Sequence, residues 1–233
     1  MVDKTVASLE AAVAGIHDGA TLMIGGFGTA GQPTDLIEAL IAQGAKDLTV
    51  VNNNAGNGDT GLAALLQARR VRKIICSFPR QADSYVFDAL YRAGEIELEV
   101  VPQGNLAERI RAAGAGIGAF FTPTGFGTLL AEGKETRVIG GRPHVLEYPL
   151  GADFALIKAH RGDRLGNLVY RKTGRNFGPI MATAAACAIA QVDEVVEIGA
   201  LDPEAIVTPG IFIRRVVAVR ASSAARKPPQ ATA

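Results

Sequence analysis

The sequence predicts an α/β protein: a mostly parallel sheet flanked by helices, with antiparallel hairpin additions in the second half. Three observations support this fold class. Short runs rich in aliphatic residues alternate with segments of helical periodicity over residues 20–113, which is typical of a parallel sheet covered on both faces. Polar loops rich in glycine and asparagine separate these segments. After residue 114, glycine-rich turns follow the apolar runs instead, which favours hairpins.

The expected elements of the first half follow one another in a regular cycle. Apolar residues at helical spacing predict a helix over residues 6–16, and the apolar run 20–24 predicts a buried strand. Pro33 begins the next helix and Gly44 ends it. The remaining segments are expected to be strands at 48–51, 71–77 and 96–101, and helices at 62–68, 82–93 and 106–113.

The second half is less regular. Gly140 and Gly141 predict a hairpin turn, and a second hairpin is expected around Gly162 and Asp163. The alanine-rich run 179–190 predicts a helix. Strands are expected at 154–159, 167–170, 194–198 and 211–219. No repeat or linker interrupts the chain, so we expect one domain over residues 1–220 and a disordered tail over residues 221–233.

Composition excludes several classes of function. The chain has 24 basic and 23 acidic residues, a net charge of +1, which gives no reason to expect nucleic acid or an anionic membrane as a partner. No run of about 18 apolar residues predicts a membrane span, and the N-terminus does not resemble a signal peptide, so a cytoplasmic location is expected. Cys76 and Cys187 both lie in apolar runs, so neither a disulfide framework nor a metal site is expected.

A glycine-rich loop over residues 25–33 follows the first strand. It contains Gly25 and Phe27, and a G-x-G-x-x-G spacing at Gly26, Gly28 and Gly31. That spacing also occurs in dinucleotide-binding proteins, but those place an acidic residue after the second strand, where this chain has asparagines. A structural turn is the simpler alternative. Because each glycine costs backbone entropy, we expect the backbone to approach a ligand or another chain closely here.

Amide side chains follow two of the expected strands. Asn52, Asn53 and Asn54 follow the strand at 48–51, and Gln103 follows the strand at 96–101. Ligands of open α/β sheets bind at these carboxyl ends. Amides donate hydrogen bonds without carrying charge, which suits an oxyanion or a carboxylate. The alternative is a loop that satisfies only its own backbone. Asn105 is expected to cap the helix that follows it.

Cationic side chains occur in two places that also suggest an anionic ligand. Arg80 follows the third strand, where its guanidinium can pair with a carboxylate. A solvated arginine is an equal alternative. A second group surrounds Asn176 and consists of Arg164, Arg171, Lys172 and Arg175. An anionic ligand, an acidic facing chain or simple solvation would each explain this group.

The sequence does not contain a complete catalytic set. No histidine has an obvious acidic partner, and there is no G-x-S-x-G motif. The residues alone therefore indicate a polar, amide-rich binding site in an α/β protein.

Residues 18–33, DGATLMIGGFGTAGQP, resemble the signature of the family I CoA-transferases. Residues 51–58, 100–135 and 153–177 are similar to the A half of the 3-oxoacid CoA-transferases, so the resemblance covers about residues 2–219. Within that family, residues 76–110 are most similar to the enzymes that act on 3-oxoadipate.

The resemblance implies covalent catalysis by a glutamate. Its carboxylate attacks the acyl-CoA thioester to give an anhydride, and CoA thiolate then forms a glutamyl-CoA thioester from which CoA passes to the acceptor acid. In the family this glutamate lies in a Ser-Glu-Asn-Gly stretch of the B half, which this chain lacks. The chain is therefore expected to contain no catalytic nucleophile and to be the A-type component of an A2B2 assembly with a B-type subunit. The assembly would move CoA from succinyl-CoA to a 3-oxoacid, with 3-oxoadipate favoured.

The resemblance also implies roles for the residues singled out above. Asn53, Asn54 and Gln103 would hold the acceptor carboxylate or the anhydride oxygen, and the glycine loop would allow close backbone approach. No cofactor or metal is expected, since the CoA thioester is a substrate. We add the hypothesis that Arg80 anchors the distal carboxylate of a dicarboxylic acid. A non-enzymatic small-acid-binding or regulatory domain of the same fold stays open as the alternative.

Overall fold

A computed structural model describes residues 2–219. The predicted tail over residues 221–233 lies outside the described residues. Among the described residues, no helix has the length and apolar character needed to cross a membrane.

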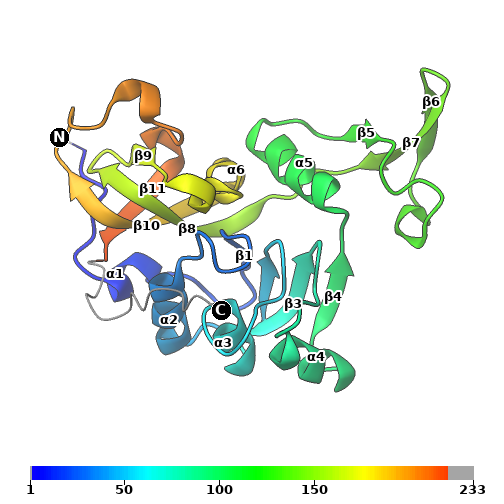
Figure 1. Cartoon of the computed structure of the whole chain (residues 1–233), viewed down its shortest axis with the longest axis horizontal. Helices are drawn as coiled ribbons and strands as arrows, with labels where there is room; N and C mark the ends of the chain where they lie inside the picture. Colours follow the sequence, from blue (N-terminus) through cyan, green and yellow to red (C-terminus); the bar gives the residue numbers. More distant parts are fainter. Residues whose placement is uncertain (1, 220–233) are drawn as a thin grey trace, which may run out of the picture.

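An eight-stranded sheet forms the body of the molecule (Figure 1). The strands lie in the order β11-β10-β8-β1-β2-β3-β4, and β9 pairs with β8. Every neighbouring pair in this order is parallel, whereas β9 is antiparallel to β8. The strands are β1 Thr21–Ile24, β2 Leu48–Val51, β3 Val71–Cys76, β4 Glu97–Val100, β8 Ala152–Asp163, β9 Leu168–Val169, β10 Ala185–Val196 and β11 Ile213–Ala218. The predicted fold class and the hairpin at Gly162 and Asp163 are therefore confirmed.

Helices cover both faces of this sheet. They are α1 Leu9–Val13, α2 Thr34–Gln43, α3 Leu62–Gln67, α4 Tyr85–Arg92, α5 Gln103–Gly114 and α6 Gly178–Ala184. Figure 1 shows α1 to α4 on one side of the sheet and α5 and α6 on the other. Short 3-10 helices complete the elements: η1 Leu129–Ala131, η2 Lys172–Arg175, η3 Pro203–Ala205 and η4 Gly210–Phe212.

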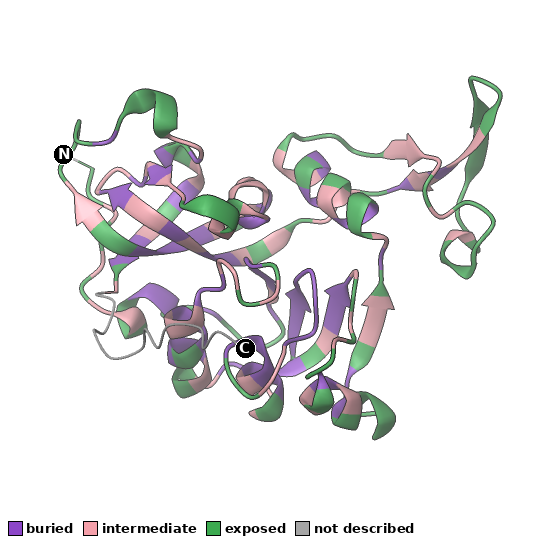
Figure 2. Cartoon of the chain, in the orientation of Figure 1, coloured by how far each residue is buried: buried purple, intermediate pink, exposed green. Residues whose placement is uncertain are grey.

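Two hydrophobic cores result, one on each face. Successive side chains of a strand point to opposite faces, and β1 shows this clearly. Leu22 and Ile24 belong to the core under α1 to α4, whereas Met23 belongs to the core under α5 and α6. Figure 2 shows the central strands as mostly buried. Burial on both faces explains why the central strands β1 and β2 are apolar in the sequence except for one threonine each.

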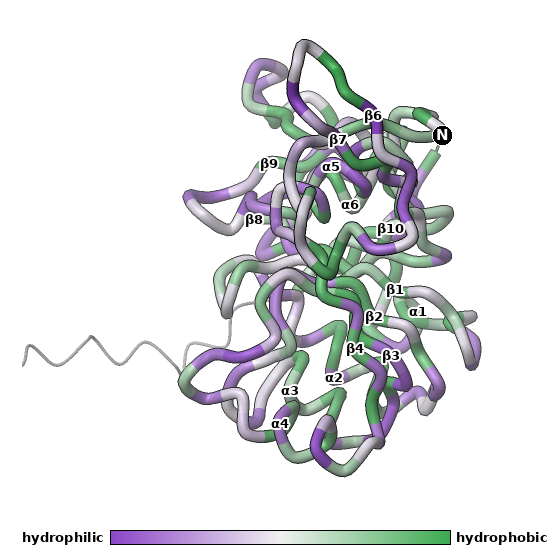
Figure 3. Tube along the Cα trace, turned by 90° about the vertical axis from the view of Figure 1, so that its right-hand side faces the viewer, coloured by the Kyte–Doolittle hydropathy of each residue, from purple (hydrophilic) through white to green (hydrophobic). Residues whose placement is uncertain are grey.

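A small antiparallel sheet forms an arm that extends away from the body (Figure 1). It contains β5 Phe120–Thr122, β6 Thr136–Ile139 and β7 Arg142–Glu147 in the order β5-β7-β6. The predicted turn at Gly140 and Gly141 joins β6 to β7. Figure 3 shows β6 and β7 in the upper half of the molecule, with α3 and α4 at the bottom.

The arm is fixed to α5 by a buried carboxylate, that of Glu147. It accepts hydrogen bonds from Asn105 Nδ2 at 3.1 Å and from Lys134 Nζ at 2.8 Å. The predicted helix cap at Asn105 is therefore wrong. Helix α5 already begins at Gln103, so Asn105 lies within its first turn and its side chain reaches the arm instead.

Two predicted helices are shorter than the sequence suggested. Within the run 179–190, helix α6 ends at Ala184 and strand β10 begins at Ala185. Alanine favours helices, but this segment lies between β8 and β11 and pairs with both, so tertiary contacts override the propensity. The first helix covers only Leu9–Val13, because the chain before it bonds β11 through Val6 N and Val216 O.

We expect Leu156→Ala to destabilise the chain by about 2–5 kcal/mol, because it leaves a cavity in the fully buried middle of β8. Urea unfolding followed by circular dichroism measures the change. Leu129→Ala removes the same atoms from an 81% exposed side chain and should change the free energy of unfolding by no more than about 0.5 kcal/mol. Equal effects of the two substitutions would contradict this description of the core.

Candidate functional site

The carboxyl ends of β1, β2, β3 and β4 meet at one edge of the sheet (Figure 1), because neighbouring strands are parallel. The loops after these strands carry the glycine run, the asparagines, the Ser77 segment and Gln103. Open α/β sheets bind ligands at this edge. The sequence-predicted residues are therefore gathered in one region, although they do not all face the same space.

Asn53 is the centre of a side-chain network although it is only 1% exposed. Its Oδ1 accepts hydrogen bonds from Gln103 Nε2 at 2.7 Å and from Ser77 Oγ at 2.8 Å. Its backbone carbonyl accepts from the backbone N–H groups of Ser77 and Phe78. Because two donors hold the amide oxygen of Asn53, the orientation of this side chain is fixed. Its Nδ2 group is then left to donate hydrogen bonds to a ligand.

A hollow of about 360 Å³ lies beside this network. Its lining residues are Phe27, Asn53, Ser77, Phe78, Gln81 and Gln103. Phe27 and Phe78 are half exposed, so the hollow has aromatic walls and an amide floor. Three of the predicted site residues therefore line one space: Phe27, Asn53 and Gln103.

Sequence reasoning missed Ser77, Phe78 and Gln81 as lining residues. Residues 77–81 have the sequence SFPRQ, and sequence reasoning selected only the charged arginine. The sequence nevertheless contains a signal for the other three residues, because this segment directly follows the strand β3, just as the asparagines directly follow β2. The backbone bridge between Asn54 and Phe78 then brings the two loops together.

Asn52 and Asn54 have different surroundings from Asn53. Asn52 Nδ2 donates to the Ile24 carbonyl at 2.6 Å, and its Oδ1 accepts from Asn54 N. Asn54 Oδ1 accepts from Gly56 N at 2.8 Å. Both side chains are buried. Asn52 holds the loop against β1, whereas Asn54 bonds within the loop and does not line the hollow. Among the described residues, Asn54 Nδ2 has no hydrogen-bond partner.

The glycine loop turns sharply after β1. Gly25 N bonds the Leu156 carbonyl of β8 at 2.9 Å, and Phe27 and Ala30 exchange two backbone hydrogen bonds. Gly31 has φ +73°, and a Cβ there would lie 2.5 Å from the Gly174 carbonyl oxygen. The close approach expected for this loop therefore occurs at Gly31, and the approaching backbone belongs to the same chain.

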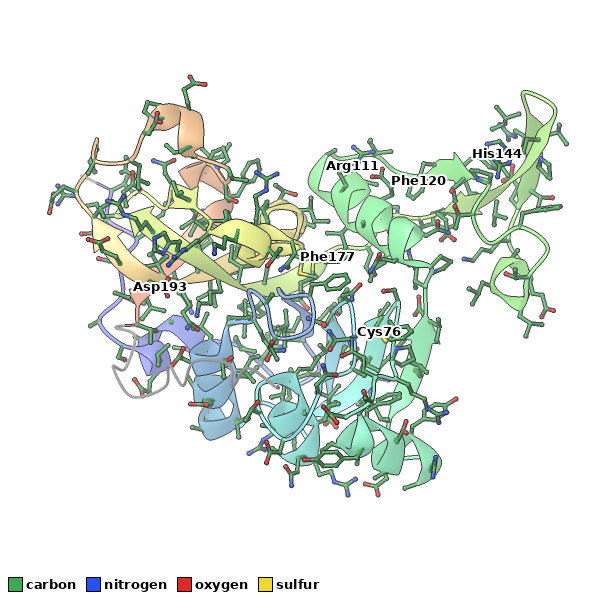
Figure 4. All side chains as sticks on the ribbon, viewed as in Figure 1. Cys76, Arg111, Phe120, His144, Phe177 and Asp193 are labelled. Atoms are coloured by element: carbon green, nitrogen blue, oxygen red, sulfur yellow. The ribbon has the colours of Figure 1, made fainter. Side chains whose placement is uncertain are left out.

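The approaching segment is η2 with the residue after it. Asn176 Nδ2 donates to the Ala30 carbonyl at 2.9 Å, which fixes η2 over the glycine loop. Figure 4 labels Phe177 above the loop that follows β1. A second hollow, of about 540 Å³, lies between the two segments. Its lining residues are Phe27, Ala30, Lys172, Thr173, Arg175 and Asn176.

Arg80 lies near the first hollow but does not line it. Its Nε donates to Asp88 Oδ1 at 2.7 Å, and its side chain is 55% exposed. Its neighbours Phe78 and Gln81 do line the hollow. The ion pair with Asp88, on α4, is an interaction that the sequence did not indicate.

The first hollow lacks an activated nucleophile, because none of its lining residues has a carboxylate, an imidazole or a thiol. Its one hydroxyl, that of Ser77, donates to the amide oxygen of Asn53 and has no base among the lining residues. Cys76 ends β3 close to this edge, but it is fully buried, and burial raises the pKa of its thiol to about 12. A thiol with such a pKa is protonated at neutral pH and is a poor nucleophile. The hollow therefore offers hydrogen-bond donors to a reaction but not the attacking group. Among residues 2–219, no group of three or more His, Cys, Asp or Glu side chains has the geometry to hold a metal ion.

Residues 6–219 match the family model described as coenzyme A transferase. The chain belongs to the coenzyme A transferase family. It is 73% identical over 224 residues to the A subunit of 3-oxoadipate CoA-transferase from Pseudomonas putida, a match that covers 96% of this chain and 97% of the relative. It is 67% identical over 228 residues to the protein of the same name from Acinetobacter baylyi, covering 98% and 100% of the two chains.

Solved structures of coenzyme A transferases share the fold. A crystal structure of an acyl-CoA transferase from Escherichia coli O157:H7 superposes with a TM-score of 0.83 at 23% identity. The match covers 95% of the present chain and 48% of the Escherichia coli chain, so the present chain corresponds to about half of the Escherichia coli chain. Family membership confirms the resemblance seen in the sequence and favours CoA chemistry over the nicotinamide interpretation of the glycine spacing.

We expect Gly31→Ala to disturb the site more than Gly28→Ala. Both residues have positive φ, so each substitution strains the backbone by about 1–2 kcal/mol. Only at Gly31 does the new methyl group also collide with Gly174, whereas nothing lies within 4 Å at Gly28. Thermal unfolding midpoints of the two variants measure the difference, and a Gly31→Ala midpoint equal to that of Gly28→Ala would contradict the loop contact.

Proposed function

We propose that this chain is the A-type component of a heteromeric CoA-transferase that moves CoA from succinyl-CoA to 3-oxoadipate. The observation that carries the proposal is a hollow that supplies fixed hydrogen-bond donors without an activated nucleophile. The names of the relatives that are 73% and 67% identical support both the reaction and the acceptor acid. They also disfavour the alternative of a non-enzymatic small-acid-binding domain.

The proposed role of the hollow is to stabilise negative charge. Attack of a carboxylate on a thioester places that charge on the carbonyl oxygen, and donors that are already oriented stabilise it best. Asn53 is oriented in this way because Ser77 and Gln103 both hold its amide oxygen. Its Nδ2 group would then donate to the thioester or anhydride oxygen. Gln103 and Asn54 stay in the proposal as further polar groups beside the reacting carboxyl.

The attacking glutamate would come from a B-type subunit. Both relatives are named as the A component of their enzyme, which supports a partner chain, and the double length of the Escherichia coli structure fits a fusion of two such halves. We propose an A2B2 assembly located in the cytoplasm, with the CoA thioester as a substrate and no cofactor. The glycine loop would lie close to the partner at the shared site.

Purification of this chain with its B-type partner tests the proposal. The pair should convert succinyl-CoA and 3-oxoadipate to 3-oxoadipyl-CoA, followed by absorbance, and this chain alone should not. Asn53→Ala in the pair should lower kcat by about 10²–10³-fold, because it removes a donor to the developing oxyanion. Ser77→Ala should have a smaller effect, since Gln103 still holds Asn53. A well-formed pair that is inactive with every 3-oxoacid would overturn the proposal.

Arg80 has its own test within the same assay. If Arg80 anchors the distal carboxylate of the acceptor, Arg80→Ala should raise the KM for 3-oxoadipate by about ten-fold or more, which is typical for loss of a charged hydrogen bond. The KM for 3-oxobutanoate, which has one carboxylate, serves as the matched control and should not change. An unchanged KM for 3-oxoadipate would contradict this role. The ion pair with Asp88 would then be the interaction that Arg80 provides.

A further inference from the structure

The second hollow borders the first, because Phe27 lines both. The first hollow has amide donors, whereas the second has the cations Lys172 and Arg175 on its wall. Phe27 is 50% exposed and forms part of the wall of each hollow. A ligand that reaches past Phe27 would therefore meet uncharged donors at one end and positive charge at the other.

The positive charge of this wall is not neutralised by an ion pair within the part of the chain that the structure describes. Among the ion pairs of residues 2–219, none includes Lys172 or Arg175. The nearby cations behave differently: Arg161 pairs with Glu194 and Arg164 pairs with Glu197. Arg142, Arg171, Arg214 and Arg215 also form no ion pair among the described residues, so Lys172 and Arg175 differ from them in lining the second hollow.

The cationic segment is also held in a defined place. Asn176 bonds the Ala30 carbonyl and the Thr173 carbonyl, at 2.9 and 2.7 Å. Lys172 has φ +52°, a left-handed conformation that non-glycine residues rarely adopt. Strained backbone of this kind persists only where the surroundings enforce it, and among the three such residues of the described chain, Asp47, Arg69 and Lys172, only Lys172 lines a hollow of this site. The segment is therefore more than a solvated run of charges.

We propose that Lys172 and Arg175 form a subsite for an anionic group of the substrate, at the end away from the reacting carbonyl. This inference rests on the function proposed above, in which the reacting end lies at Asn53. Arginine recognises carboxylates and phosphates through paired hydrogen bonds, and lysine adds a compact positive charge. Phe27 would then pack against the apolar part of the ligand between the two ends.

Two sources supply the required anionic oxygen atoms. One is the second carboxylate of a dicarboxylic acid, which Lys172 and Arg175 would then anchor in place of Arg80, and the other is a phosphate of CoA. Two inhibitors separate them: adipate has two carboxylates and no phosphate, and free CoA has phosphates and no carboxylate. Their dissociation constants are measured by calorimetry on the purified pair, so the readout does not depend on turnover.

Lys172→Gln and Arg175→Gln are the test variants. We expect each to weaken binding of one of the two inhibitors by about ten-fold or more. A change for adipate assigns the subsite to the carboxylate, and a change for CoA assigns it to a phosphate. In the active pair, the KM of the matching substrate should rise while kcat stays close to its original value, since the contacts of Asn53 are intact.

Arg72→Gln is the matched control. It removes the same charge from an exposed arginine on β3, paired with Glu97 and remote from both hollows. It should leave both inhibitor constants unchanged. Unchanged constants for both inhibitors in the Lys172 and Arg175 variants would overturn the subsite. Weaker assembly of the pair with unchanged constants would also overturn it, because the cations would then bind an acidic surface of the partner. Inhibitor binding without any transferase activity would instead refute the proposed function and leave the subsite standing.

Discussion

Parallel hydrogen bonding between β1 and β8 joins two stretches of chain that are far apart in the sequence. Leu22 lies opposite Phe154 and Ile24 lies opposite Leu156, and Gly25 continues the ladder by one more bond. Strand β1 thus stands in the middle of the sheet, with β2 to β4 on one side and β8, β10 and β11 on the other. Its carboxyl end is the place where amides from the first half and cations from the second half meet.

Rigidity at that place comes from contacts between loops, because the strands themselves end before it. The backbone of Gly31 against Gly174, and the Asn176 bond to Ala30, fix the second half against the glycine loop. The hydrogen bonds around Asn53 fix the ends of β2, β3 and α5 relative to one another. Side chains of a binding site keep their geometry when packing and neighbouring hydrogen bonds lock them, and here those hydrogen bonds tie each loop to the next.

The sequence predicted the parts of the site that follow from local pattern. Apolar runs on both sides of β1 indicated the sheet, and the position of Asn53 and Gln103 after strands indicated their shared edge. It predicted only the end of β10, through the strand expected at 194–198, because Ala185 to Ala190 favour a helix when considered alone and become a strand only through pairing with β8 and β11. Nor did it predict the partners of Arg80 and Asn105, which lie on α4 and on the arm. Contacts of that kind form only in the folded chain, and they do not produce a periodic pattern in the sequence.

The separation of β1 from β8 has a consequence for synthesis on the ribosome. The two strands are joined by contacts that span 132 residues, as between Thr21 and Asp153. Chains grow at about 5–20 residues per second, so β1 waits on the order of ten seconds for its second neighbour. During that interval β1 has one unpaired edge, and such edges attract other strands. Folding of the central sheet therefore finishes late, after the arm has been made, and the growing chain is most exposed to mispairing before β8 emerges.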